Sequence, residues 1–301
     1  MQEQQYTKGQ LAVRRAHSSS DIGVLIATFA TFFLLSAGSF IISYFASDEF
    51  KSQEFSLLTI VFGLLGVAIA AVFFFALMLG IGMIIIRIQR QMMLGNALQV
   101  EYSDYAWLRD WVNEVAADLE MPRVELFVTQ DPVINAYAFG FVRPYTIVLH
   151  SGSIRYLTKD ELKVVVVHEM GHIKYGHTIA SLYLLPFMNL PVLGAFFGWL
   201  AGFWQRRAEL TSDRLALMYL GNSELVKASL IKVHVGPDVA KSMNDVARQW
   251  QQYVAERPMN RFAQTFSSHP FLVRRISHID RYKSIVEPQP TPAPTEQPAA
   301  Q

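Results

Sequence analysis

The chain has 301 residues, of which 51% are hydrophobic and only 17% are charged, and its mean hydropathy is +0.22. Soluble proteins usually carry about a quarter charged residues, so the composition excludes both a disordered chain and an ordinary soluble globule. The formal net charge of +1 does not indicate a nucleic-acid-binding protein, and we expect no nucleic-acid partner. The absence of cysteine excludes disulfides, thiolate metal sites and a cysteine nucleophile. Any metal site must therefore use histidine and carboxylate ligands.

Two uncharged apolar blocks lie near the N-terminus, at residues 22–45 and 56–86. Each exceeds the roughly 20 residues that cross a bilayer, so residues 22–98 are predicted to form a transmembrane hairpin and a stalk. A cleaved signal peptide is the alternative for the first block, but that block is long and a second one follows it. Basic residues flank the hairpin and its connecting loop is acidic. The positive-inside rule then places an N-terminal tail, residues 1–21, and everything after the hairpin in the cytoplasm.

From about residue 98 the composition is that of a folded domain, which we expect to extend over residues 99–286. Apolar residues at helical spacing predict a helix over residues 107–119. Three β-rich runs separated by proline-containing turns predict a small sheet, with strands at 124–128, 133–139 and 145–149. The proline-rich polar segment 287–301 cannot bury a core and is predicted to be a disordered tail.

A helix that begins at a capping box carries the first candidate metal ligands. Thr158 and Glu161 form the box, and the same segment continues into the motif His168-Glu-Met-Gly-His172. Residues four apart lie on one helical face, so both imidazoles can reach a single zinc ion. Glu169, rotated by about 100° around the helix, can reach water at that ion. The pattern predicts a catalytic zinc site, and two unrelated surface histidines are the alternative.

A downstream segment supplies candidates for the third ligand. A catalytic zinc ion usually has three protein ligands and an open position. Glu209 and Asp213 are also four residues apart, so one can bind the metal while the other accepts the outer N–H of a ligating histidine. An exposed charged helix in which Arg206 pairs with Glu209 is the alternative.

Together these motifs resemble the HtpX-type membrane zinc metallopeptidases, which are gluzincins related to the CAAX prenyl proteases. The resemblance covers the apolar hairpin and residues 98–285, and it rests on four ordered motifs: HEMGH, the Glu209 and Asp213 pair, Asn135-Ala-Tyr-Ala-Phe-Gly140 and Ser268-His-Pro270. The chain departs from the family at Ser212, where alanine is usual, and in a shorter stretch before Glu209. The resemblance implies an α+β fold: a mainly helical zincin-like metalloprotease domain with a small β-sheet, preceded by a two-helix transmembrane hairpin.

The resemblance also implies roles for individual residues. The implied ligands of one zinc ion are His168, His172 and Glu209. Glu169 is the implied general base, Asp213 supports the ligands, and we expect Arg206 close behind them. His269 is the implied donor to the oxyanion, for which Tyr137 and Tyr145 are alternatives. The residues implied beside the substrate backbone are Asn135 and Ala136, at a sheet edge where a substrate strand could pair.

A third apolar block, residues 179–204, lies between His172 and Glu209. One complete crossing would place these two ligands on opposite sides of the membrane, and the block is too short for two crossings. Pro186 and Pro191 divide it into two halves. We therefore predict a re-entrant or membrane-resting helical hairpin, with an ordinary buried hairpin as the alternative.

The sequence thus predicts a membrane-anchored zinc endopeptidase that hydrolyses peptide bonds of membrane or membrane-proximal, misfolded proteins. Its expected partners are protein substrates and the lipid bilayer, and its expected location is a bacterial plasma membrane with the catalytic domain in the cytoplasm. A proteolytically inactive scaffold or chaperone and a narrow-specificity processing protease are the alternatives. The remaining histidines are interpreted as tail, surface or satisfied core residues: His17, His150, His177, His234 and His278.

Overall fold

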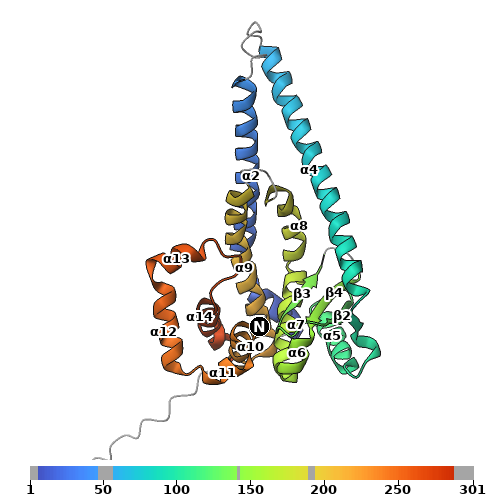
Figure 1. Cartoon of the computed structure of the whole chain (residues 1–301), viewed down its shortest axis with the longest axis vertical. Helices are drawn as coiled ribbons and strands as arrows, with labels where there is room; N and C mark the ends of the chain where they lie inside the picture. Colours follow the sequence, from blue (N-terminus) through green and yellow to red (C-terminus); the bar gives the residue numbers. More distant parts are fainter. Residues whose placement is uncertain (1–5, 47–56, 141–142, 189–193, 288–301) are drawn as a thin grey trace, which may run out of the picture.

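The computed structural model describes residues 6–46, 57–140, 143–188 and 194–287. Two long helices, α2 (Ser19–Ala46) and α4 (Leu57–Leu94), project from one end of a folded domain, as Figure 1 shows. The domain itself holds one four-stranded sheet among many helices. This mostly helical architecture with a small mixed sheet agrees with the predicted fold class.

The sheet has the strand order β1-β2-β4-β3. Its strands are β1 (Leu98–Gln99), β2 (Val124–Thr129), β3 (Ala136–Phe139) and β4 (Tyr145–His150). β2 and β4 are parallel, whereas β3 pairs antiparallel with β4, with Ala136 opposite Leu149. The third strand begins at Ala136 rather than at residue 133, where the sequence placed it. β3 forms one edge of the sheet, so its outer side is open to another strand.

Helix α7 (Lys159–Lys174) crosses the domain as its central helix and carries the HEMGH motif. Its capping box is confirmed, because the Glu161 N–H donates to Thr158 Oγ1 at 3.3 Å and the Thr158 N–H donates to Glu161 Oε2 at 2.8 Å. The valines at 164–167 are all buried. A helix surrounded by protein is apolar on every side, which explains how a run of β-branched residues lies in a helix.

Helix α9 (Gly194–Leu220) passes very close to α7. A Cβ atom added to Gly171 would lie only 3.0 Å from Ser212 Oγ and 3.1 Å from Ser212 Cα. Glycine at this position lets the two helices pack closely, because a Cβ there would push Ser212 away by a few tenths of an ångström. The crossing brings Glu209, one turn before Ser212, up to the histidines of α7.

Residues 8–16 are not part of a tail, contrary to the expectation for residues 1–21. They form α1 (Lys8–Ala16), in which Ala12 and Ala16 are buried in the core of the domain. A Cβ added to Gly9 would lie 2.1 Å from the Asp118 carbonyl oxygen, so α1 packs directly on α5 (Ala106–Asp118). α1 buries mainly alanine and glycine, and such small residues give a weak hydrophobic pattern in the sequence.

The third apolar block forms α8 (His177–Met188) except for its first two residues, and the first part of α9, and both helices rise beside α2 and α4 (Figure 1). Phe187, Phe197 and Trp204 are buried in a cluster that α2 and α4 help to cover. Phe196 and Phe203 stay 41% and 37% exposed. The block is thus a pair of helices with one covered and one exposed face. Pro186 lies within α8, and Pro191 lies outside the described residues.

The described residues include one helical stretch, Val61–Leu94, that is long and apolar enough to cross a membrane. Residues 19–31 form a shorter apolar stretch within α2. The predicted two-helix transmembrane hairpin therefore stays a prediction. The predicted connecting loop falls largely in residues 47–56, which lie outside the described part of the chain, as do residues 288–301 of the predicted tail.

The C-terminal part of the domain is helical. Its helices are α10 (Ser223–Val235), α11 (Pro237–Ser242), α12 (Asp245–Glu256), α13 (Pro258–Gln264) and α14 (Leu272–Tyr282). α14 packs against α9 and α10, which brings it to the HEMGH helix. α12 and α13 form an outer arm, drawn in orange in Figure 1. The remaining short helices are η2 (Val100–Tyr102), α6 (Ser151–Tyr156) and η3 (Lys283–Ile285).

Candidate metal centre

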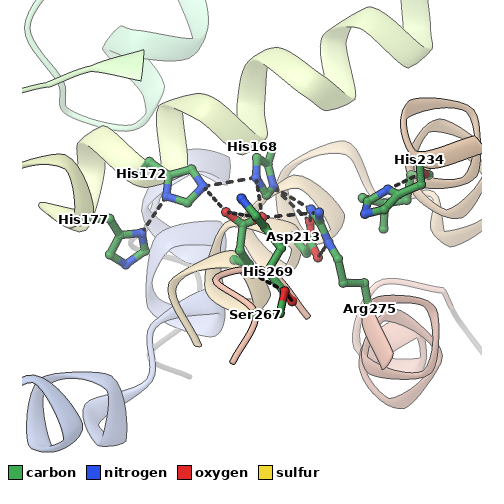
Figure 2. A network of polar contacts seen from close by, with 10 residues as sticks. His168, His172, His177, Asp213, His234, Ser267, His269 and Arg275 are labelled. Carbon is green, nitrogen blue, oxygen red and sulfur yellow. Dashed lines mark hydrogen bonds and ion pairs between the residues drawn. The ribbon is translucent and has the colours of Figure 1, made fainter. Parts of the chain in front are cut away.

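Three side chains from two helices meet at the crossing of α7 and α9. His168 Nε2 lies 3.1 Å from His172 Nε2 and 3.5 Å from Glu209 Oε2, and His172 Nε2 lies 3.4 Å from Glu209 Oε1. Figure 2 shows both imidazoles turned toward the same point. Among the described residues, these three form the group that could hold a metal ion.

The spacing of these donor atoms fits zinc. Zinc binds imidazole nitrogen and carboxylate oxygen at about 2.0–2.2 Å, and a tetrahedral arrangement then separates neighbouring ligand atoms by about 3.3–3.5 Å. The three observed distances of 3.1, 3.4 and 3.5 Å match that separation. Three ligands of this kind leave a fourth position open, as in catalytic zinc sites.

Asp213 holds the first histidine from behind. His168 Nδ1 donates to Asp213 Oδ1 at 2.9 Å, which leaves the Nε2 lone pair of His168 facing the metal position. Burial alone would lower the pKa of His168, but its bonds to Asp213 and Glu209 raise that pKa to about 10. Imidazole binds a metal in its neutral form, so a metal ion must displace this proton.

The positive charge of Arg275, on α14, compensates the negative charges of the buried carboxylates Asp213 and Glu209. Its Nε donates to Asp213 Oδ2 at 2.7 Å, its Nη2 donates to Asp213 Oδ1 at 2.5 Å, and its Nη1 lies 3.3 Å from Glu209 Oε2. Burial would raise the pKa of Asp213, yet the charge of Arg275 lowers it well below its usual range. The pKa of Glu209 is likewise held low against burial by His168, His172, His269 and Arg275. Both carboxylates are therefore charged at neutral pH.

The second histidine has a partner that sequence reasoning missed. His177, at the start of α8, places its Nδ1 3.2 Å from His172 Nδ1, on the side away from the metal position (Figure 2). Burial and the neighbouring His172 lower the pKa of His177 to about 3, so His177 is neutral. His172 can then donate its Nδ1 proton to His177 and keep Nε2 free for a metal. His177 lies beyond the end of α7, so no helical spacing marked it.

Glu169 borders an open cleft at the metal position. One cavity of about 320 Å³ is lined by Glu169, His172 and Glu209 together with Ala136, Tyr137 and Ala138 of the edge strand β3. A second cavity of about 390 Å³ shares Glu169 and Glu209 with the first and includes Asn135 and Ala136. The cleft thus follows the open edge of the sheet.

The predicted substrate-binding and donor residues surround this cleft. The backbone of Asn135 is held by Ser153, whose Oγ accepts the Asn135 N–H at 3.0 Å and donates to its carbonyl at 2.7 Å. His269 lines both cavities, and its Nδ1 lies 3.3 Å from Glu209 Oε1. Tyr137 also lines the first cavity, while Tyr145 lines neither.

Arg206 is not behind the metal ligands, and this expectation is wrong. Its Nη1 donates to the backbone carbonyls of Thr265, at 3.0 Å, and of Ser267. Arg206 therefore holds the segment that leads to His269, and Arg275 is the arginine that contacts the carboxylates. Of the remaining histidines, His150 lies 3.4 Å from Asp131 and His234 Nδ1 contacts the Leu230 carbonyl at 2.8 Å. Neither belongs to the ligand group.

Two histidines and a glutamate at zinc spacing, beside a second glutamate and an open strand edge, are the arrangement of a metallopeptidase. The sequence model of peptidase family M48 matches residues 103–283. The chain belongs to peptidase family M48, which confirms the resemblance drawn from its motifs.

Named relatives agree with this family. The plastoglobule-localized metallopeptidase 48 of Arabidopsis thaliana is 33% identical over 218 residues, which are 64% of this chain and 62% of that protein. A Protease HtpX homolog of Bacteroides fragilis (strain YCH46) is 25% identical over 209 residues, 54% of this chain and 64% of the relative. A CAAX prenyl protease 1 homolog of Oryza sativa subsp. japonica is 33% identical over 94 residues, 30% of this chain and 22% of the relative. The chain spans about three fifths of the length of the first of these relatives.

The fold has a distant likeness among solved structures. The crystal structure of S. mikatae Ste24p matches with a TM-score of 0.45 and 17% identity, over 67% of this chain and 58% of that one.

Proposed function

We propose that this chain is a membrane-anchored zinc endopeptidase that cuts membrane or membrane-proximal proteins. One observation carries the proposal: His168, His172 and Glu209 present three donor atoms at the spacing of zinc ligands, in a cleft that also holds Glu169. Zinc in such a site acts as a Lewis acid and makes water a stronger acid and nucleophile. Every group needed for peptide hydrolysis is present, which favours an enzyme over an inert scaffold.

Different residues of the chain bind the substrate, transfer the proton and stabilise the oxyanion. A substrate segment pairs with the open edge of β3 from Ala136 onward and passes the side chain of Asn135, so that main-chain hydrogen bonds to β3 hold it across the cleft. Glu169 accepts the proton of the attacking water and then passes it to the leaving amine. His269, at the border of both cavities, donates a hydrogen bond to the oxyanion that forms at the scissile carbonyl.

Membrane anchoring is supported by the apolar helices. The stretch Val61–Leu94 of α4 is long enough to cross a bilayer, and many of its large side chains are exposed. α2 and the helix pair of residues 179–204 extend from the same end of the domain (Figure 1). The lining of the first cavity includes Ser181 and Trp204 of that pair. A cleft so close to the apolar helices suits substrates that lie in or next to the membrane.

The test is the Glu169→Gln variant of the full chain, purified in detergent and loaded with zinc. We expect it to keep zinc stoichiometry and to cleave casein or a membrane-protein substrate about 10²–10⁴-fold more slowly than the parent. Glu256→Gln, at an exposed position on α12, is the matched control and should cut normally. Chelation should stop cleavage by the parent. A parent that binds zinc but cuts nothing would favour a scaffold, and a fully active Glu169→Gln would refute the assigned base.

A further inference from the structure

Helix α13 and the turn after it expose a patch of large apolar side chains. Met259, Phe262 and Phe266, which we call the α13 patch, are 74%, 61% and 63% exposed. The rings of Phe262 and Phe266 pack edge to face with their centroids 5.3 Å apart, so the patch is one continuous surface. Soluble surfaces rarely leave such side chains clustered in water, and a patch of this kind marks an interaction surface.

Two side chains of α9 hold the segment that follows α13, and they thereby fix the position of the α13 patch along α9. Trp199 Nε1 donates to Thr265 Oγ1 at 3.2 Å, and Arg206 Nη1 donates to the Thr265 carbonyl at 3.0 Å and to the Ser267 carbonyl. A Cβ added to Gly202 would lie 3.3 Å from the Ser267 carbonyl oxygen, so this segment touches the backbone of α9. The patch therefore lies beside residues 199–206.

The part of α9 beside the patch, residues 199–206, lies where the apolar helices leave the folded domain. Asp21, at the beginning of α2, pairs with Arg207 Nε at 2.8 Å, and the apolar run of α2 starts at the next residue. On α9, Phe203 is 37% exposed one turn before Arg207. In Figure 1, α13 lies at the height of the lower end of α2, whereas α11 lies at the far end of the domain. The patch thus continues the exposed apolar surface of α9.

The charged residues of the segment that carries the α13 patch have one sign. The sequence contains no aspartate or glutamate between Glu256 and Asp280, and this stretch contains four arginines. Arg257, Arg261 and Arg274 are exposed, and Arg275 is the buried one. Exposed apolar side chains next to arginines are the composition of a helix that lies in a membrane interface and contacts anionic headgroups. A protein partner would not require the patch to lie at the level where α2 and α9 become apolar.

We propose that α13 lies in the interface of the bilayer, with Met259, Phe262 and Phe266 among the acyl chains and Arg257 and Arg261 at anionic phosphate headgroups. The proposal rests on the proposed membrane anchoring. It adds a contact outside the predicted hairpin and outside residues 179–204. It also joins the bilayer to the cleft, because the segment after Phe266 leads directly to Ser267 and His269.

That connection is short and ordered. Ser267 Oγ donates to the His269 carbonyl at 2.8 Å and accepts the His269 N–H at 3.2 Å. His269 then reaches Glu209 at 3.3 Å. The bilayer therefore helps to hold His269 at the border of the cleft, and the cleft opens next to the membrane surface.

The natural absence of cysteine allows a direct test with single spin labels. Phe262→Cys, Val246→Cys and Phe73→Cys would each be labelled in the full chain, which is then reconstituted into vesicles of phosphatidylcholine and phosphatidylglycerol. All three parent residues are large, apolar and exposed, at 61%, 73% and 69%. Val246, at the other end of α12, is the matched control, and Phe73 of α4 reports membrane insertion. Collision with oxygen, which concentrates in lipid, is compared with collision with a water-soluble nickel complex.

We expect the ratio of oxygen to nickel accessibility at residue 262 to be several-fold higher than at residue 246 and close to that at residue 73. Met259→Cys should repeat this result and serves if the label at 262 prevents folding. Equal ratios at 262 and 246, with a lipid-exposed label at 73, would overturn the α13 proposal and leave the anchoring intact. A water-exposed label at 73 would refute the anchoring itself. Burial of 262 from both reagents would indicate a protein partner and would also overturn the proposal.

Discussion

Arg275 and Asp213 form a buried two-point ion pair behind the metal position, with Nε–Oδ2 and Nη2–Oδ1 distances of 2.7 and 2.5 Å. Asp213 Oδ1 also accepts the Nδ1 proton of His168. The guanidinium thus fixes the carboxylate that fixes the ligand, and Figure 2 shows the three side chains in a row. Groups that orient a metal ligand in this way contribute to metal affinity without touching the metal.

Replacement of Arg275 should weaken metal binding. In Arg275→Lys the charge is kept but the two-point contact with Asp213 is lost, because an ammonium cannot match a carboxylate as the planar guanidinium does. We expect zinc affinity, measured by competition with a chromophoric chelator, to fall about 10–100-fold. Arg274→Lys changes the exposed neighbouring arginine and should bind zinc as the parent does. Equal affinities for the two variants would show that the ion pair does not support His168.

Removal of the Ser212 hydroxyl should stabilise the domain. Ser212 is fully buried against Gly171, and its Oγ has no hydrogen-bond partner among the described residues. A buried polar group without a partner costs about 1–3 kcal/mol, and alanine also has the higher helix propensity. We expect Ser212→Ala to raise the thermal unfolding midpoint without loss of zinc. Ser277→Ala, at an exposed position on α14, controls for helix propensity, and a lower midpoint for Ser212→Ala would reveal a missed partner.

The salt link between α7 and α10 should make stability depend on acid pH. Glu161 Oε1 lies 2.7 Å from Lys232 Nζ. Burial would raise the pKa of Glu161, but Lys232 and the capped N-terminus of α7 lower it below its ordinary value of 4.5. A depressed folded-state pKa contributes stability above the unfolded pKa and loses it as pH falls through the folded pKa.

The Glu161→Gln variant tests this link. At pH 7 we expect it to be less stable than the parent by about 1–3 kcal/mol, and the difference should shrink as pH falls below 4.5. Asp160→Asn removes an exposed carboxylate one residue away and should have a smaller effect at every pH. Denaturant unfolding followed by circular dichroism gives both curves. A stability difference that is constant from pH 7 to pH 3 would contradict the depressed pKa.

The sequence predicted those parts of the site that lie within one helix. His168 and His172 share a helical face by spacing alone, and the capping box located the start of α7. Arg275 was missed because it lies 62 residues after Asp213 and reaches it only when α14 packs on α9. His177 was missed because its contact with His172 depends on the turn between α7 and α8. Long-range packing of this kind leaves no periodic pattern in a single sequence.

Arg206, expected behind the metal ligands, should instead control the position of His269. Its guanidinium holds the carbonyls of Thr265 and Ser267, so Arg206→Met would free the segment that leads to the cleft while keeping the apolar stem. We expect kcat/KM for peptide cleavage to fall about 10-fold or more, since a misplaced donor loses much of its effect on the oxyanion. Zinc affinity should not change, because Arg206 contacts none of the three ligands. Arg207→Met, which removes a contact with Asp21 instead, should cut faster than Arg206→Met. A loss of zinc in Arg206→Met would instead show that Arg206 supports the metal ligands.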